Sequence, residues 1–354
     1  MMAEQKLKMN LQCPMPQLDF DIITLGHGSG GLLTNKLLDS GVFDLLKNDL
    51  LDERHDGAIF NVETGRMAFS TDSYVVSPVF FPGGNIGELA VNGTVNDLAM
   101  CGAQARYLSL AFIIEEGLSM RAFWDILVSI KMAAEKSGIL IVTGDTKVVE
   151  RGKGDQIFIN TSGVGMVHPQ ARIARSRVET GDKIIISGNV ATHGMAIMSM
   201  RRGLEFESDL VSDTTNLNHT VMRLLDVFGE KIHLLSDPTR GGVAAVLNEL
   251  ARDAKLGIEL HQKAIPVLDD VYGACELLGL DPLYVANEGV FIAVVAPEAA
   301  EAFLDALQQD ENGAHAAIIG EVVEMHPRQV IMHSGIGGKR VVNMPVGEQL
   351  PRIC

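Results

Sequence analysis

A polar segment near the middle of the chain separates two stretches in which apolar strands and amphipathic helices alternate. It covers residues 166–182 and contains HPQAR and VETGDK, with a proline and a Gly-Asp turn signal. The chain has 354 residues, which is more than one hydrophobic core normally supports. We therefore predict two domains of α/β or α+β class, over residues 19–168 and 169–345. A loose extension would precede them at residues 1–18, and a mobile tail would follow at residues 346–354.

The charge and the cysteine pattern exclude several classes of protein. The formal net charge is −16 and no block of lysine or arginine occurs, so we expect neither nucleic acid nor a membrane surface as a partner. No apolar run reaches the about 18 residues of a membrane helix, and the start of the chain lacks the apolar core of a signal peptide. The cysteines form no CxxC pair and stand far apart, at Cys13, Cys101, Cys275 and Cys354. We expect a cytoplasmic protein with reduced thiols.

Helical spacing of apolar residues is clearest in the first half of the chain. Such residues recur every three or four positions from Ile86 to Leu98, and the next long helix would stop at Gly138. Cys101 and Cys275 lie on predicted apolar helical faces, so we expect both thiols to be buried and inert.

A glycine-rich loop, GHGSGG, covers Gly26 to Gly31. Four glycines in six residues let backbone amides curl around an anion, and a helical pattern follows. The loop matches neither the Walker pattern nor GxGxxG. A phosphate-binding loop and an ordinary flexible connection are therefore both open interpretations.

Three aspartates occupy similar places at the ends of apolar strands or at a helix turn. They are Asp72 in STDSYV, Asp97 in VNDLA and Asp145 in TGDTKVVE. Carboxylates of this kind can hold Mg²⁺, which prefers oxygen ligands and bridges nucleotide phosphates. Lys147 lies two residues after Asp145, so on an extended segment it points the same way. For each aspartate alone, a turn or a helix cap is the competing interpretation.

Two further acidic motifs lie in the second half. In SDPTRGG, Asp237 and Thr239 could cap the helix that begins near Val243, while the glycines allow a ligand to approach closely. In ANEGV, Glu288 lies in a turn that we expect between two strands. It could act as a base, or it could be a solvated hairpin residue.

The chain ends in LPRIC, with Cys354 as the last residue. A free thiol at a terminus is a liability unless it is used. A prenylation site is excluded, because that motif places the cysteine four residues from the end. The remaining interpretations are an unused end and a reactive carrier.

Several stretches together resemble the HypE family of hydrogenase maturation factors. This family belongs to the superfamily of aminoimidazole ribonucleotide synthetases and selenophosphate synthetases. The resemblance runs from about Asp21 to Cys354 and rests on GHGSGG, the stretch from STDSYVV to DLAMCGA, FIIEEGL, VTGDTKVVERG, DPTRGGV, CELLGLDPL, NEG and PRIC. The loops occur across the superfamily, whereas the terminal Pro-Arg-Ile-Cys distinguishes this family.

The resemblance implies a fold, an activity and partners. Members of the family pair through their N-terminal domains into a barrel-like homodimer and bind ATP with Mg²⁺. They dehydrate an S-carboxamide on the C-terminal cysteine to a thiocyanate, which supplies the cyanide ligands of the iron in nickel–iron hydrogenase. A HypF-type carbamoyltransferase loads the cysteine, and a HypC–HypD complex accepts the cyano group.

The same resemblance assigns roles to positions of this sequence. It implies that Cys354 is the carrier, that Lys147 lies near the reacting groups and that Glu288 is a possible base. ATP and its phosphates would contact Gly28, Gly30, Gly31, Asp72, Asp97, Asp145, Thr146 and Lys147. The ligands of Mg²⁺ would be Asp72, Asp97 and Asp145.

Two alternatives of different class stay open at this point. One is another ATP-dependent enzyme of the superfamily, such as a selenophosphate synthetase or a kinase. We expect a selenophosphate synthetase to carry a cysteine or selenocysteine by its glycine loop, and GHGSGG has none. The other is a non-enzymatic scaffold tethered through its tail cysteine, which would consume no ATP.

Overall fold

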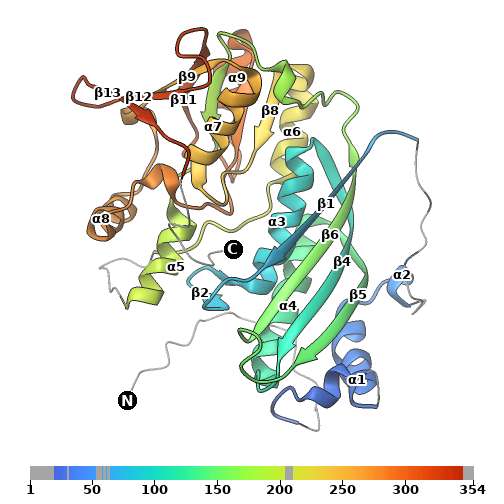
Figure 1. The fold of residues 1–354 in the computed structure, drawn as a ribbon. Coiled ribbons are helices and arrows are strands. Elements are labelled where there is room, and N and C mark those ends of the chain that lie inside the picture. Colours follow the sequence, from blue (N-terminus) through green and yellow to red (C-terminus); the bar gives the residue numbers. More distant parts are fainter. Residues whose placement is uncertain are drawn as a thin grey trace.

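The structure is a computed structural model that describes residues 20–29, 32–52, 58, 61, 64–203 and 210–345. Two β-sheets, each accompanied by helices, form the two halves, and the predicted two-domain fold of mixed α/β class is confirmed. A four-stranded sheet occupies the lower half of Figure 1, and a seven-stranded sheet the upper half. The extension at residues 1–18 and the tail at residues 346–354 lie outside the described residues.

The four-stranded sheet has the order β1–β6–β4–β5, with bounds Met67–Tyr74, Ile157–Val167, Ala103–Glu115 and Leu140–Val149. The first three strands in this order are antiparallel, whereas β4 and β5 are parallel. The parallel step needs a crossover, and α4 (Met120–Ser137) supplies it. This helix begins after Ser119, whose side chain accepts a hydrogen bond from the amide of Ala122. It ends at Gly138 in a left-handed conformation, as predicted.

Helix α3 (Ile86–Met100) joins the two halves. Asn85 caps it by accepting hydrogen bonds from the amides of Gly87 and Glu88. It packs on the four-stranded sheet and on α4, and its last turn enters a core cluster of the second half. Gly93 allows the close packing, because a Cβ there would lie 2.2 Å from the hydroxyl oxygen of Tyr74. The two halves therefore share buried residues through this helix, and buried residues from 191–198 and 271–275 of the second half also join the core cluster of the first.

The seven-stranded sheet has the order β13–β12–β9–β11–β7–β10–β8. In that order the bounds are Lys339–Val342, Val330–His333, Gly257–His261, Ala317–Val323, Lys183–Ile186, Ile292–Val295 and Ile232–Ser236. Neighbouring strands are antiparallel except β12 and β9. One face packs against α7, and the other packs against α6 and α9. The helices of this half are α5 (Thr192–Arg202), α6 (Asn218–Phe228), α7 (Gly242–Ala254), α8 (Asp269–Leu278) and α9 (Ala300–Gln308).

The remaining elements are short. Before the first sheet come a 3-10 turn, a helix, a π-helical turn and a last helix, which are η1 (Leu25–Gly28), α1 (Leu32–Leu37), η2 (Leu38–Phe43) and α2 (Asp49–Asp52). A two-stranded ribbon precedes α3, made of β2 (Phe80–Phe81) and β3 (Gly84–Asn85). The other 3-10 turns are η3 (Arg175–Arg177), η4 (Gly229–Lys231), η5 (Gln262–Ala264), η6 (Pro282–Tyr284) and η7 (Pro297–Ala299).

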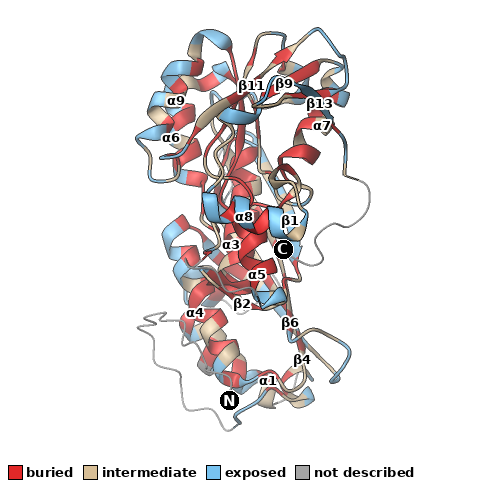
Figure 2. Ribbon diagram, turned by 90° about the vertical axis from the view of Figure 1, so that its left-hand side faces the viewer, coloured by how far each residue is buried: buried red, intermediate tan, exposed pale blue. Residues whose placement is uncertain are grey.

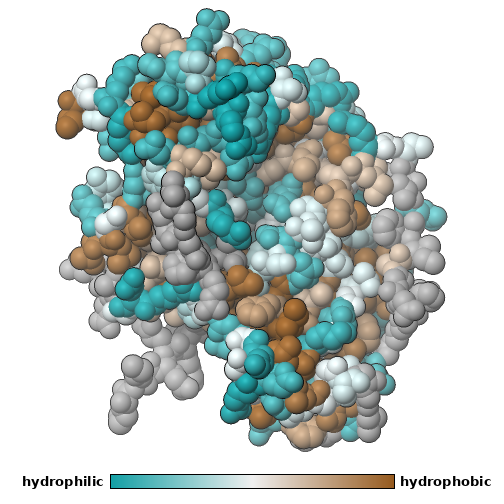
Figure 3. All heavy atoms as spheres, viewed as in Figure 1, coloured by the Kyte–Doolittle hydropathy of each residue, from teal (hydrophilic) through white to brown (hydrophobic). Residues whose placement is uncertain are grey.

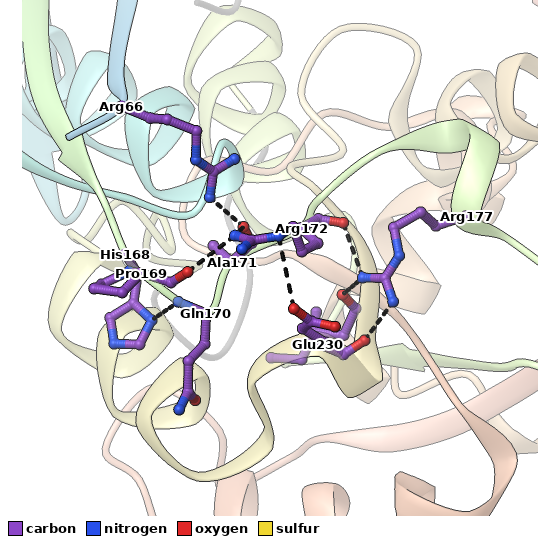
Figure 4. Close-up of polar contacts among 9 residues, drawn as sticks. Arg66, His168, Pro169, Gln170, Ala171, Arg172, Arg177 and Glu230 are labelled. Atoms are coloured by element: carbon purple, nitrogen blue, oxygen red, sulfur yellow. Dashed lines mark hydrogen bonds and ion pairs between the residues drawn. The ribbon is translucent and has the colours of Figure 1, made fainter.

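Arginines hold the polar segment between the two sheets in place (Figure 4). Arg66 and Arg172 both donate hydrogen bonds to the carbonyl of Ala171. Arg177 donates to the carbonyls of Arg172 and Glu230, at 2.9 and 2.7 Å. The guanidinium groups thus pair backbone carbonyls that a linker would otherwise leave to water.

One face of the four-stranded sheet is uncovered in the single chain. Figure 2 shows α3 and α4 on one side of β4 and β6. In the view of Figure 3, hydrophobic side chains gather over the lower half, where Figure 1 draws this sheet. Large apolar side chains on it are exposed, with Phe69 at 68%, Ile113 at 47%, Met67 at 43% and Leu140 at 43%. The described chain does not close this sheet into a barrel, so the barrel stays a prediction that needs a second copy.

Candidate functional site

Four carboxyl groups interact electrostatically at the seam between the two halves. We call this group the seam cluster. It consists of Asp72 on β1, Asp97 in α3, Asp237 after β8 and Glu288 before β10. The cluster brings together two of the three predicted magnesium ligands and the predicted base.

The first two members lie on the helix-covered side of the four-stranded sheet. Successive side chains of β1 point to opposite faces, so Asp72 shares a side with Ser70. The Ser70 hydroxyl donates a hydrogen bond of 2.7 Å to Oδ2 of Asp97, which links β1 to α3. One oxygen of Asp72 accepts a hydrogen bond from the amide of Ser73 at 2.7 Å. Neither aspartate caps a helix, so both keep acceptor capacity for a ligand.

Of the two open interpretations of Glu288, the structure excludes the solvated hairpin residue. Glu288 lies in the segment before β10, which begins only at Ile292, and it has 4% exposure. Asn287 anchors this segment by donating to the carbonyl of Pro238 at 2.8 Å and accepting from the amide of Ala191 at 2.7 Å. Asn96 of α3 donates to the carbonyl of Glu288 at 3.2 Å. The segment is therefore tied to both halves.

Sequence analysis missed the role of Asp237. A cap of α7 was one interpretation of this aspartate, but the cap of that helix is Gly241, and no side chain bonds there. Asp237 instead interacts with Asp97 and Asp72 from the other half. A turn motif and a ligand-binding motif look alike in sequence. The one signal that could have placed Asp237 in the cluster is the short spacing between the end of a strand and two glycines.

Burial and mutual repulsion raise the pKa values of three carboxyl groups in the seam cluster. Burial and the charge of Asp72 raise the pKa of Asp97 to about 6, against a hydrogen bond from Ser70. Burial and Asp97 raise the pKa of Asp237 to about 7. Burial, with several acidic neighbours, holds the pKa of Glu288 well above its ordinary value. Carboxyl groups that repel one another in this way are stabilised when a cation joins them.

The carboxylate oxygens of the cluster are the kind of ligand that a hard cation prefers, although they are not arranged around a single point. Oε1 of Glu288 is buried and has no hydrogen-bond partner within the described part of the chain. Such an orphaned oxygen is costly unless a ligand satisfies it. Among the described residues, no three acidic, histidine or cysteine side chains are close enough together to hold a metal ion. The chemistry of the cluster fits Mg²⁺, while its spacing leaves room for phosphate oxygens among the ligands.

The third predicted magnesium ligand lies elsewhere. Asp145 is on β5, where Oδ1 forms an ion pair of 2.7 Å with the ammonium of Lys147. We call these two residues the β5 pair. Both are exposed, at 59% for the aspartate side chain and 63% for the lysine. The hydrogen bond from Lys147 lowers the pKa of Asp145.

The two carboxylate sites lie on opposite faces of the same sheet. Asp145 and Lys147 are paired in register with Ala111 and with the exposed Ile113 of β4, so they point to the uncovered face. The seam cluster is on the face that α3 covers. Strands β1 and β5 are also the two edges of the sheet, with two strands between them. Within one chain, the structure therefore does not bring Asp145 to Asp72 and Asp97.

The glycine loop lies beside the β5 pair. A Cβ on Gly28 would lie 2.5 Å from the amide nitrogen of Val148, so only glycine fits there. Gly28, Thr146 and the β5 pair line one cavity of about 220 Å³, whose floor is apolar. Gly30 and Gly31 lie outside the described residues. The loop and TGDTK thus form one surface, as a phosphate or nucleotide site requires.

The chain leaves the described part of the structure close to the seam cluster. Cys354 itself lies outside the described residues. The last described residue, Pro345, packs on Gly241, where an added Cβ would lie 3.2 Å from its Cγ. Just before it, the Tyr284 hydroxyl donates a hydrogen bond of 3.0 Å to the carbonyl of Asn343. The start of the tail is therefore fixed in the loop that follows Asp237.

The structure tests the predicted burial of Cys275 and Cys101. Cys275 is buried, as predicted, and burial raises the pKa of its thiol to about 12. Cys101 was predicted to be buried, but it follows the last turn of α3 and is exposed. A larger cavity of about 700 Å³ between α8 and the β12–β13 turn contains none of the predicted site residues. In the described part of the chain, no helix combines the length and the apolar character that a membrane span requires.

Comparison with known proteins gives a consistent family. Residues 54–167 match the N-terminal domain of AIR synthase related proteins, and residues 179–332 match the C-terminal domain. The carbamoyl dehydratase HypE of Bradyrhizobium diazoefficiens is 50% identical over 333 residues, which cover 94% of this chain and 96% of that protein.

Solved structures agree in fold. A hydrogenase maturation protein HypE in complex with ATP has a TM-score of 0.90 and 45% identity, over 94% of this chain and 99% of that one. A chain of a HypE–HypF complex has a TM-score of 0.77 and 41% identity, over 89% of this chain and 100% of that one.

Proposed function

The chain belongs to the HypE family of carbamoyl dehydratases, and from this premise we propose that it uses ATP to convert an S-carboxamide on Cys354 to a thiocyanate. The thiocyanate would supply cyanide for the iron of nickel–iron hydrogenase. One observation carries the proposal for this chain. The tail starts against Gly241, in the loop that holds Asp237 of the seam cluster.

The length of the tail supports this assignment. Nine residues follow Pro345, and an extended chain of that length spans at most about 30 Å. That reach includes the seam cluster, whose member Asp237 lies four residues before Gly241. The same reach allows Cys354 to extend outward to a HypF-type carbamoyltransferase for loading. The likeness to a chain of a HypE–HypF complex supports that partner.

We assign the chemistry as follows. An amide oxygen is a poor leaving group, so the carboxamide oxygen attacks the γ-phosphorus of ATP, the bond to the bridging oxygen breaks, and ADP leaves. One N–H proton is lost to give an O-phosphorylated imidate. Removal of the second N–H proton forms the nitrile as the C–O bond breaks, and phosphate leaves with the former carboxamide oxygen. The sulfur stays bonded to the nitrile carbon.

Three groups of side chains would divide this work. Glu288 is the proposed base, since its raised pKa lets it hold the protons that it accepts. Lys147 would place a fixed cation against the phosphates. Asp72, Asp97 and Asp237 would each offer a carboxylate to Mg²⁺ bridged by phosphate oxygens, since no three of the described side chains lie close enough to hold an ion alone, and Asp145 remains a further predicted ligand.

The uncovered sheet face supports the predicted homodimer. Its exposed apolar side chains would otherwise form an unusually large apolar patch on a monomer. The β5 pair lies on this same face, so pairing through it would bring Asp145 and Lys147 to the interface. A HypC–HypD complex as acceptor of the cyano group, and a cytoplasmic location, remain parts of this proposal that rest on family membership.

The test is the intact mass of the C-terminal peptide. We expect incubation with a HypF-type carbamoyltransferase and carbamoyl phosphate to add one carbamoyl group to Cys354. After the loaded protein is separated from the transferase, ATP and Mg²⁺ should remove one water from that adduct. Cys354→Ser is the control and should not give a thiocyanate. An unmodified Cys354 would overturn the carrier role, and an adduct that keeps its water with ATP would favour a scaffold.

A further inference from the structure

A fifth acidic side chain, Asp213, supports the segment that carries Glu288. Its Oδ1 accepts a hydrogen bond of 3.2 Å from the backbone amide of Glu288. The amides of Gly289 and His193 also face this carboxylate and act against the rise in its pKa that burial causes. The Asp213 carboxylate thus faces backbone amides from the start of α5 and from the segment before β10.

The contact between these segments is close along its length. A Cβ on Gly289 would lie 1.7 Å from the carbonyl oxygen of Asp213, so no side chain fits at position 289. The neighbouring Ser212 hydroxyl is 2.7 Å from Nδ1 of His193, which is fully buried. The residues around Asp213 therefore pack directly on the backbone that presents the proposed base.

Glu288 needs such support because it lies on no helix or strand. Its amide is held by Asp213 and its carbonyl by Asn96, while its side chain is 4% exposed and keeps an unpartnered buried oxygen. After burial, repulsion by Asp213 is the largest cause of the raised pKa of Glu288. An asparagine would accept the same amide hydrogen bond without that repulsion, which makes the native carboxylate noteworthy.

We propose that Asp213 is a positioning residue that fixes the backbone of Glu288 and thereby directs the Glu288 carboxyl group toward the seam cluster. This inference rests on the proposed role of Glu288 as base. It assigns no contact of Asp213 with the substrate. Displacing a catalytic group by about 1 Å can cost roughly 100-fold in rate, so the loss of the amide acceptor should slow dehydration strongly.

The test uses the full-length protein, loaded on Cys354 beforehand, and follows single-turnover loss of water at varied ATP concentration. We expect Asp213→Ala to lower the maximal rate by roughly 10- to 100-fold with an unchanged half-saturating ATP concentration. Asp213→Asn keeps an acceptor for the Glu288 amide and should stay within about threefold of wild type. Asp182→Ala is the matched control, because Asp182 is also buried and accepts an amide, that of Glu179 at 2.8 Å, far along the chain from Glu288.

A double variant separates positioning from independent roles. If Asp213 acts through Glu288, then Asp213→Ala combined with Glu288→Gln should be no slower than Glu288→Gln alone. A wild-type rate in Asp213→Ala overturns the inference and leaves the base in place. A fully additive loss in the double variant also overturns it. A wild-type rate in Glu288→Gln overturns the base assignment itself. If Asp213→Ala does not fold, a tenfold or larger loss in Asp213→Asn at unchanged melting temperature counts against the inference.

Discussion

The seam cluster and the β5 pair each contain predicted magnesium ligands of the four-stranded sheet and its helix, yet their charged groups are arranged in opposite ways. In the seam cluster Asp72 is exposed, Asp97 and Asp237 are half-buried and Glu288 is buried. Its members repel one another, and the pKa values of Asp97, Asp237 and Glu288 are raised. The β5 pair is exposed, contains its own cation, and the pKa of Asp145 is lowered. The first is a site that a cation would complete, whereas the second already contains one.

The largest difference should appear in the dehydration rate. We expect Asp97→Asn or Asp237→Asn to lower single-turnover loss of water by roughly 100-fold or more, because each removes charge stabilisation at the phosphates. Asp145→Asn should cost only about tenfold. The measurement is the mass of the loaded tail peptide over time after ATP addition. An equal loss in all three variants would erase the distinction and return Asp145 to the central set.

A smaller effect is expected at the other member of the β5 pair. Lys147→Ala should lower the rate roughly tenfold and raise the half-saturating ATP concentration, because a fixed cation beside the phosphates is lost. Lys147→Arg keeps the charge and should recover part of that loss. Isothermal titration with ATP checks the binding component. If both variants match wild type, the β5 pair has no role at the phosphates.

The pH dependence of Mg²⁺ binding should differ between the sites. Magnesium requires ionised carboxylates, so affinity at the seam cluster should rise by up to about tenfold per pH unit for each proton that binding displaces, as pH increases from 5.5 to 7.5. That window follows from pKa values of about 6 for Asp97 and about 7 for Asp237. Titration of wild type and Asp237→Asn at three pH values checks it. The variant should lose most of the dependence above pH 6.5, and Asp145→Asn should keep it.

The smallest effect concerns stability without metal or nucleotide. A carboxyl group with a raised folded-state pKa contributes most below its unfolded value, and the contribution is lost as pH rises through the folded value. For Asp237 that loss occurs between about pH 4 and 7. Asp237→Asn should therefore raise the melting temperature by roughly 2–4 °C at pH 8 and leave it unchanged at pH 4. Asp145→Asn, whose pKa is lowered, should give no gain at pH 8.

The sequence predicted the individual motifs of this molecule better than the contacts between residues that are far apart in the chain. Asp72 and Asp97 were proposed as partners, and the pleat of β1 and the position of α3 do bring them together. A cap stays one of the open interpretations of Asp237 because its 140-residue separation from Asp97 carries no local signal. The turn interpretation of Glu288 follows from Asn and Gly, which favour turns, and only tertiary packing buries this residue.

The sequence also could not predict which face of the sheet each aspartate occupies. Two aspartates at strand ends look equivalent in sequence, but one residue of register decides which face each occupies. Asp145 therefore separates from Asp72 although both follow apolar strand residues. Cys101 shows the same limit at a helix end, because the sequence pattern does not reveal that α3 stops at Met100 and leaves this thiol exposed.

The anchoring of Pro345 against Gly241 has a kinetic meaning. A thiol tethered within about 30 Å of its own site is present there at an effective concentration on the order of millimolar, whatever the concentration of the protein. The site then needs little intrinsic affinity for the carboxamide group. A loaded protein should react at a rate independent of dilution, whereas a detached peptide with the same last residues would need millimolar amounts to compete.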